Sequence, residues 1–233
     1  MVKSRKEILF VGRGASNAAN WQTCLTFLLV PTPLTEGAQI HLGFQRAWNE
    51  ISEEVFFAVK EAFRDNPDYS LVFVGGSMGG AVATVGAAYL REAGYAIDLY
   101  TFGSPRVGNG ILSDFITNQS GLERRVTHNA DPVPRLPPTN LYPSYRHISP
   151  EIWIQGEPTN PDQWPVEDIS VCEGNWNREC NAKPSNPCDM ADHTFYFGSL
   201  ECWNPEAVGA VETLSIPPGF RSEIIDLCSI GGL

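Results

Sequence analysis

Short apolar runs recur along the chain, separated by stretches with a different periodicity. Residues 7–11, 71–74 and 97–102 have the length and composition of buried strands. Residues 124–128, which mix apolar and polar side chains before a proline-rich segment, are predicted as one further strand, and residues 145–154 have the pattern of a late strand. These segments together predict a β-sheet with several short strands.

Two helices are predicted between the strands. From Phe44 to Ala62 the apolar residues recur three or four positions apart, which is the spacing of an amphipathic helix, and Asn66-Pro67 ends it. Residues 78–93 form a second, small-residue helix with Gly94 as its cap. Strands that alternate with helices predict an α/β fold, with a mostly parallel sheet and helices on both faces.

Composition limits the class of protein. With 233 residues, 42% of them hydrophobic, the chain can bury a substantial core, and we expect a single domain over residues 1–233. Its longest apolar runs fall short of the roughly 20 residues that a membrane helix needs. The formal net charge of -11 argues against a nucleic-acid partner, because no basic stripe is available to neutralise phosphates.

The cysteines favour an oxidising compartment. The chain has six: Cys24, Cys172, Cys180, Cys188, Cys202 and Cys228. Their spacing matches no zinc site, so disulfides are the better interpretation, with Cys180 and Cys188 as a local pair and with Cys172 and Cys228 able to bridge elsewhere. The apolar segment at residues 8–11 is too short for a signal peptide, so none is expected in this sequence.

The sequence Gly75-Gly76-Ser77-Met78-Gly79 lies between a predicted strand and a predicted helix and fits the pattern G-x-S-x-G. In this pattern a serine in a strained turn is raised above the sheet as a nucleophile, and the flanking glycines let strand and helix pass closely. No lysine follows, which excludes a phosphate-binding loop. The remaining alternative is a helix whose small residues only pack close to the sheet.

A nucleophilic serine needs a base to take its proton. Three histidines follow it in the chain: His128, His147 and His193. His128 falls within a predicted strand and His147 at the start of another, so packing is the expected role of both. His193 opens an aromatic segment after a loop, from which an imidazole can reach over the sheet. We therefore expect His193 to be the base.

The base in turn needs a carboxylate that orients it. Asp131 stands at the end of a predicted strand, where α/β sheets place their sites, and the prolines that follow stiffen its turn. Asp189 and Asp192 are its rivals, although a residue adjacent to His193 seldom points at the same ring. Asp131 is therefore the expected orienting acid.

Several separated segments, in this order, resemble the fungal class 3 lipase family, the filamentous-fungal triacylglycerol lipases and their feruloyl esterase relatives. They are RGASNAANW at residues 13–21, HLGFQRAWNEI at 41–51, the serine turn, YTFGSPRVGN at 100–109, DPVPRLPP at 131–138, SYRHISPEIWI at 144–154 and DHTFYFG at 192–198. The resemblance spans nearly the whole chain. It implies an α/β-hydrolase fold.

The resemblance also implies chemistry. It implies a secreted serine hydrolase that cleaves acylglycerol esters at an oil–water interface, through an acyl-enzyme and without metal or cofactor. Ser77 is then the nucleophile, Asp131 the acid and His193 the base, with the amides of Ala15 and Met78 as the oxyanion hole. The segment that contains His147 has a structural role in the family.

The segment at residues 16–33 follows the oxyanion loop and is expected to include a lid. Trp21 is a large apolar ring on a small polar segment, which suits a lid that covers the serine in water and turns outward on lipid. In the family the lid helix begins at this distance, and a tryptophan there contacts the acyl chain. For residues 25–30, a buried strand is an equally good interpretation.

The sequence departs from the family pattern at three places. Gly76 stands where histidine is usual, and Ala15 where serine or threonine is usual. Family members also carry several tens of residues before the strand that begins near Lys6, including a signal peptide and a cysteine that pairs with the one matching Cys202. Two alternatives stay open: an aryl-ester (feruloyl) esterase on the same fold, and a truncated, inactive homologue.

Overall fold

The computed structural model describes residues 1–157, 164–183, 187–196 and 198–199. Its main sheet has six strands, in the order β1 (Glu7–Gly12), β4 (Ser70–Gly76), β5 (Ile97–Phe102), β7 (Glu123–His128), β9 (Glu151–Ile154) and β10 (Ile169–Cys172). The strands β1 to β9 of this sheet run parallel and β10 runs antiparallel. The predicted mostly parallel α/β sheet is confirmed.

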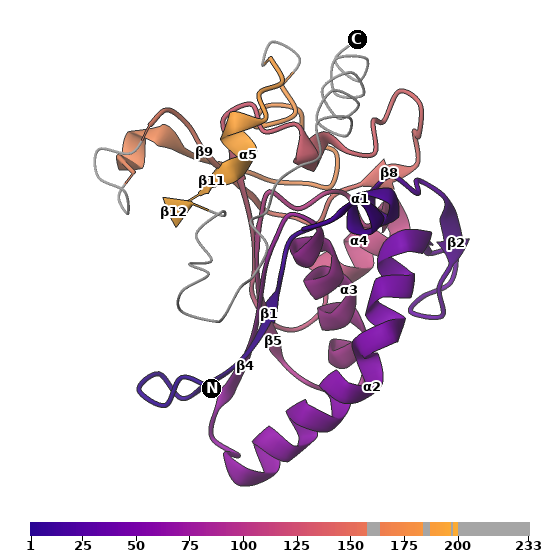
Figure 1. The fold of residues 1–233 in the computed structure, drawn as a ribbon, viewed down its shortest axis with the longest axis vertical. Helices are drawn as coiled ribbons and strands as arrows, with labels where there is room; N and C mark the ends of the chain where they lie inside the picture. The colour runs from indigo at the N-terminus through magenta and orange to yellow at the C-terminus, as the bar shows by residue number, and fades with distance from the viewer. Residues whose placement is uncertain (158–163, 184–186, 197, 200–233) are drawn as a thin grey trace.

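Three helices pack on one side of this sheet: α2 (Leu42–Asp65), α3 (Met78–Glu92) and α4 (Gly110–Thr117). Figure 1 shows α3 next to the strands and α2 outside it. A side chain at Gly86 of α3 would overlap the ring of Trp48 on α2, so the two helices approach closely there. Both predicted helices are confirmed. The longer one begins earlier than predicted, because the His41 side chain accepts the Phe44 N–H at its start.

Apolar side chains form two separate cores because they alternate along the strands. The larger core lies between the sheet and the helices and includes Phe73, Leu99 and Trp48. The smaller core includes Val126, Ile152 and Phe102, which alternate with the residues facing the helices. This second cluster therefore covers the opposite face of the sheet near the carboxyl ends of β5, β7 and β9.

The single strand predicted at residues 145–154 is two strands in different sheets. Tyr145–Arg146 (β8) joins a small antiparallel sheet with β2 (Leu29–Pro31), β3 (Gln39–His41) and β6 (Gly108–Asn109), and β9 joins the main sheet. Pro150 lies between β8 and β9 and has no N–H to donate to a ladder, which separates the two. Of the apolar residues 25–30, only Leu29 and Val30 are in a strand.

The predicted pair of Cys180 with Cys188 is wrong. Cys172 is bonded to Cys180, eight residues along the chain, with their Cα atoms 6.3 Å apart. The spacing of cysteines cannot give their connectivity. The loop after β10 folds back, and the N–H of Asn181, next to Cys180, donates to Glu151, which pairs with Cys172. Cys188 is also disulfide-bonded. Cys24 is a buried free thiol whose pKa burial raises to about 12, and Cys202 and Cys228 lie outside the described residues.

Among the helices of the described residues, none has both the length and the apolar composition that a membrane crossing requires.

Candidate active site

Ser77 occupies the sharp turn between β4 and α3. Its φ is 53° and its ψ is -130°, a conformation that non-glycine residues rarely adopt. The Ser77 N–H donates to the carbonyl of Phe102 at 2.8 Å, which ties the turn to the end of β5. Ser77 is the N-cap of α3, but its hydroxyl makes no capping hydrogen bond. That hydroxyl is therefore free for another partner.

Glycines around the turn let three backbone segments touch. A side chain at Gly75 would overlap the carbonyl of Gly79, and one at Gly79 would overlap the carbonyls of Gly12 and Arg13. The spacing G-x-S-x-G therefore has a measurable steric cause. Gly12, at the end of β1, is a third required position that the motif does not include.

His193 lies on α5 (Ala191–Thr194), a single helical turn above the sheet edge. Its Nε2 is 2.9 Å from Ser77 Oγ, across 116 residues of chain. Its Nδ1 is 2.9 Å from Asp131 Oδ2 and 3.0 Å from Asp131 Oδ1. A neutral imidazole that donates from Nδ1 to the carboxylate has its Nε2 lone pair free to accept the Ser77 hydroxyl proton.

Asp131 follows β7 and is held by the turn it starts. The N–H of Val133, in the short 3-10 helix η1 (Val133–Arg135), donates to Asp131 Oδ1 at 2.8 Å. Asp131 has no exposed surface, and only 7% of Ser77 and 6% of His193 are exposed. The three residues predicted from the sequence thus form one buried hydrogen-bonded chain.

Tyr196, which the sequence analysis did not single out, completes the surroundings of the carboxylate. It lies in β11 (Phe195–Tyr196), which pairs with β12 (Gly198–Ser199), and its hydroxyl donates to Asp131 Oδ2. Burial and the charge of Asp131 raise the pKa of Tyr196 well above its ordinary value, so the hydroxyl stays a donor. A tyrosine in an aromatic segment is expected to be a core residue. Only its position three residues after His193 could have indicated that it belongs to the site.

Gly103 forms the wall behind this cluster. Its φ is +60°, and a Cβ there would lie 2.8 Å from Asp131 Oδ2, 2.9 Å from the Tyr196 hydroxyl and 3.0 Å from His193 Nδ1. The backbone of the turn after β5 therefore packs directly on the acid and the base. A side chain at this position would displace both.

The other two histidines lie apart from Ser77. His128 Nδ1 donates to the carbonyl of Asp192 at 3.1 Å, and its ring packs among aromatic residues. His147 Nε2 donates to the carbonyl of Pro134 at 2.6 Å. Desolvation and the positive charge of Arg125 hold the pKa of His147 well below its ordinary value, so it is neutral.

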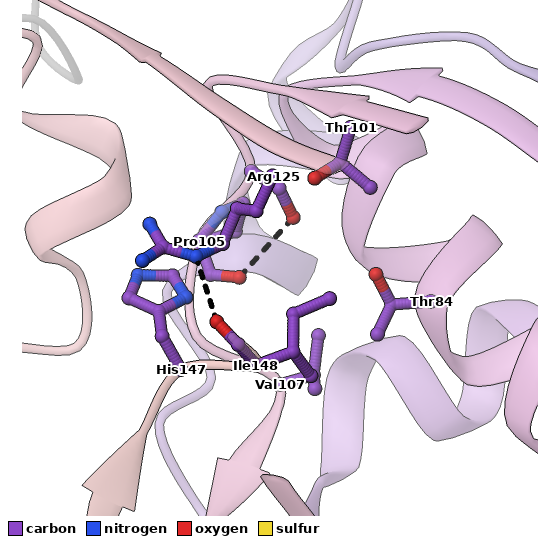
Figure 2. Close-up of a pocket in the computed structure, with 8 residues that line it drawn as sticks. Thr84, Thr101, Pro105, Val107, Arg125, His147 and Ile148 are labelled. Atoms are coloured by element: carbon purple, nitrogen blue, oxygen red, sulfur yellow. Dashed lines mark hydrogen bonds between the residues drawn. The ribbon is translucent and has the colours of Figure 1, made fainter. Parts of the chain in front are cut away.

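Figure 2 shows that the His147 ring lies beside the guanidinium of Arg125 at a small cavity. Arg125 donates to the Ile148 carbonyl at 3.0 Å and to Glu151 Oε2 at 2.8 Å. The cavity has a volume of about 10 Å³, which is about the space of one water molecule. It is a packing feature below the sheet edge and has no room for a substrate.

The rival carboxylates point elsewhere. Asp189 Oδ1 accepts the Ala191 N–H at 2.8 Å and so caps the short helix. Asp192 Oδ2 accepts the Ala130 N–H at 2.9 Å rather than facing the imidazole beside it. Among the described residues no group of histidine, cysteine and acidic side chains is arranged to hold a metal ion.

The two predicted oxyanion donors are Met78, which follows Ser77, and Ala15, which lies in the loop after β1. Met78 is the first residue of α3, and the first N–H groups of a helix lack partners within it. Ala15 is buried, two residues after Arg13, whose carbonyl packs against Gly79 of the same helix. Both remain predictions as oxyanion donors.

Trp21 is buried on the inner side of α1 (Ala18–Cys24), with only 2% of its surface exposed. The outer residues of this helix are small or polar, and Asn17 caps its start by accepting the Asn20 N–H at 2.9 Å. A groove of 270 Å³ lies between α1 and the start of α2, and Met78 also lines it. The helix therefore lies directly beside the serine turn.

The fold and the Ser77–His193–Asp131 arrangement define the class of the protein. A serine in a strained strand-to-helix turn, with its partners after later strands of a parallel sheet, is the arrangement of the α/β hydrolases. The model of the family "Lipase (class 3)" matches residues 9–141. The chain belongs to the class 3 lipase family.

Two curated relatives and one solved structure show the nearer similarity. The "Secreted mono- and diacylglycerol lipase 1" of Fusarium solani is 45% identical over 205 residues, which cover 88% of this chain and 60% of that protein. The "Secreted mono- and diacylglycerol lipase A" of Penicillium cyclopium is 38% identical over 199 residues, covering 83% and 63%. The crystal structure of a mono- and diacylglycerol lipase from Aspergillus oryzae superposes with a TM-score of 0.77 at 35% identity, covering 85% of this chain and 73% of that one.

The chain thus spans about three fifths of the length of the curated relatives, 60% and 63% respectively.

Proposed function

We propose that the chain is a single-domain, secreted serine hydrolase that cleaves the ester bonds of mono- and diacylglycerols. The observation that carries the proposal is the buried hydrogen-bonded chain from Asp131 through His193 to Ser77, which begins at a strained turn. The names of the relatives favour acylglycerols over aryl esters as substrates, and their secretion agrees with the disulfide between Cys172 and Cys180.

In the first step His193 Nε2 takes the Ser77 proton as Oγ attacks the ester carbonyl carbon. The positive charge that this puts on the imidazole is stabilised by Asp131, which is fully buried and accepts hydrogen bonds from the Val133 N–H and from His193 Nδ1. The carbonyl oxygen becomes an oxyanion between the amides of Ala15 and Met78. His193 then gives the proton to the departing alcohol, which leaves an acyl-enzyme.

In the second step water attacks the acyl carbon, with His193 as the base again, and the fatty acid leaves as Ser77 regains its proton. The chemistry needs only these side chains and two backbone amides. The proposal is tested by fatty-acid release from emulsified mono- and diacylglycerols, with a feruloyl ester assayed in parallel. Release from the glycerides alone, or much faster release from them, supports the proposal, and hydrolysis of the feruloyl ester alone overturns the substrate class.

Tyr196→Phe tests the surroundings of the carboxylate with almost no change in shape. Without the hydroxyl, Asp131 Oδ2 loses a donor that holds the carboxylate beside His193. We expect kcat/KM to fall by about tenfold, the loss that corresponds to one hydrogen bond to a charged group. An unchanged kcat/KM in a folded variant would show that the hydroxyl has no influence on the base.

We further propose that the substrate is met at an oil–water interface and that α1 is the lid. The helix is short, its outer side chains are small or polar, and its one large apolar ring, Trp21, faces inward. Exposed apolar side chains lie next to the segment that follows this helix. Leu28 is 58% exposed, and Tyr142, whose ring contacts Phe27 edge-to-face, is 38% exposed. Outward movement of α1 would add Trp21 to this apolar surface.

Kinetics across the solubility limit of a short-chain ester test the lid. Turnover should rise steeply once the ester forms droplets, and Trp21→Ala should lose more activity on droplets than on dissolved ester. Because Trp21 is buried, its loss also costs stability, about 3–5 kcal/mol for a well-packed tryptophan, so Leu28→Ser provides the second variant. Leu28 is exposed, and its replacement should reduce activity on droplets alone.

Phe57→Ser is the matched control, since Phe57 is 68% exposed and lies on α2 about 20 Å along the helix from its contact with α1. It should have no effect on either substrate form. A smooth saturation curve through the solubility limit, with equal losses on both forms, would make Trp21 a packing residue and the protein an ordinary esterase.

A further inference from the structure

Asp192 connects the two segments that carry the proposed acid and base. Its Oδ2 accepts the Ala130 N–H at 2.9 Å, and its Oδ1 accepts Asn129 Nδ2 at 3.3 Å. The side chain that directly precedes His193 therefore binds the backbone that directly precedes Asp131.

The helix that carries His193 cannot hold its own position. With four residues, α5 is a single turn, and a turn of this length pays the cost of helix nucleation without gaining propagation. Two further hydrogen bonds join the same two segments: the Asp189 N–H donates to the Ala130 carbonyl at 3.1 Å, and His128 Nδ1 donates to the Asp192 carbonyl at 3.1 Å. Asp192 takes part in the connection with both its side chain and its backbone.

The turn at residues 128–131, in contrast, is tied firmly to the sheet. Asn129 has a φ of 34°, and its N–H donates to the Ile154 carbonyl at 2.9 Å. Its side-chain Oδ1 accepts the Gly156 N–H at 2.7 Å, and its carbonyl accepts Trp153 Nε1 at 2.9 Å. These three bonds fix the turn to the end of β9. The sheet thus fixes the place of the turn, and the turn, through its hydrogen bonds to Asp192, fixes the place of α5.

We propose that Asp192 is a positioning residue that sets the place of His193 relative to Asp131 and Ser77. The inference rests on the function proposed above, because it concerns the base of that reaction. Asp192 touches neither the imidazole of His193 nor Ser77 through its carboxylate, whose two oxygens are engaged at the turn. Its removal should therefore disturb geometry and leave the reacting groups present.

Three substitutions at this position separate geometry from charge. Asp192→Ala removes the two side-chain bonds to the turn, and a displacement of about 1 Å at the base is expected to lower kcat by about 10–100-fold. Asp192→Asn keeps an oxygen for the Ala130 N–H and should stay within about fivefold of the parent. Asp192→Glu keeps the charge but is longer by one methylene, which pushes α5 outward, so its kcat should fall as far as that of Asp192→Ala.

The measurements are kcat and KM for a soluble short-chain ester, expressed per active site by titration with a fluorophosphonate, and the melting temperature of each variant. KM should stay within about twofold, since the ester-binding surface is unchanged. Asp114→Ala is the matched control: Asp114 Oδ1 accepts Asn175 Nδ2 at 2.7 Å across 61 residues, away from the site, and its loss should leave kcat per site unchanged.

Three results overturn the inference. The first is a kcat per site for Asp192→Ala within about threefold of the parent, which is too small for a displaced base. The second is an order in which Asp192→Glu is more active than Asp192→Asn, and this order decides the matter if Asp192→Ala fails to fold. The third is a folded parent chain that neither hydrolyses the ester nor reacts with the fluorophosphonate. That result overturns the proposed function itself, so the two failures are distinguishable.

Discussion

Ser77→Ala should abolish ester hydrolysis, with kcat reduced by about 10⁶-fold, the loss that follows removal of a catalytic serine nucleophile. The substitution removes only the hydroxyl group, and the hydrogen-bond partner of that hydroxyl in the structure is His193. The unusual φ of 53° is equally strained for serine and alanine, so the turn loses no conformational support. The circular dichroism spectrum should be unchanged and the melting temperature should move by no more than a few degrees.

Ser113→Ala is the control for this change. Ser113 is buried, as Ser77 is, but it lies on α4 away from the turn, and its hydroxyl has no hydrogen-bond partner within the described part of the chain. It should retain full activity. Hydrolysis by the Ser77 variant above about 1% of the parent rate would contradict the assignment, because no second route from this site is expected to approach that rate.

Asp131→Asn should lower kcat by about 10⁴-fold while leaving the fold intact. In the unsubstituted protein the carboxylate accepts the N–H of His193 Nδ1. Nε2 is then without a proton and can accept the hydroxyl proton of Ser77. An amide NH₂ that faces Nδ1 favours the opposite tautomer, in which Nε2 carries the proton and cannot act as the base. Steady-state kinetics on a dissolved ester measure the loss, and KM should change little.

His147→Asn is the companion to this prediction. His147 donates to the Pro134 carbonyl and is neutral, because desolvation and Arg125 hold its pKa well below the ordinary value. Its replacement should lower the melting temperature but leave kcat at the chemical step nearly unchanged. If His147→Asn abolished turnover in a folded protein while His193→Ala did not, the assignment of the base would be wrong.

The parts of the site that the sequence predicted are those with a local steric or positional cause. Gly75 and Gly79 flank Ser77 because backbone atoms would overlap any side chain there, and this requirement shows directly in the spacing of the residues. The strand that ends before Asp131 is short and is followed by a proline-rich turn, so its carboxyl end was recognisable. The pairing of Asp131 with His193 across 62 residues then followed from chemical roles.

The parts that the sequence missed depend on contacts between distant segments. Tyr196 and Gly103 meet at Asp131, although nothing local distinguishes them from a core aromatic residue and a turn glycine. The pairing of Cys172 with Cys180 depends on how the loop after β10 folds back, which spacing alone does not reveal. Asp192 looked like a rival acid because its residue type was right, and only the structure shows that it faces Ala130.

The most direct test of the central claim is covalent labelling of the unsubstituted protein with a fluorophosphonate, followed by digestion and peptide mapping. An activated serine at a strained turn should react once per chain, and the single adduct should lie on Ser77, with ester hydrolysis lost in proportion to labelling. An adduct on any other serine would contradict the claim. So would the absence of an adduct from a folded protein that hydrolyses esters.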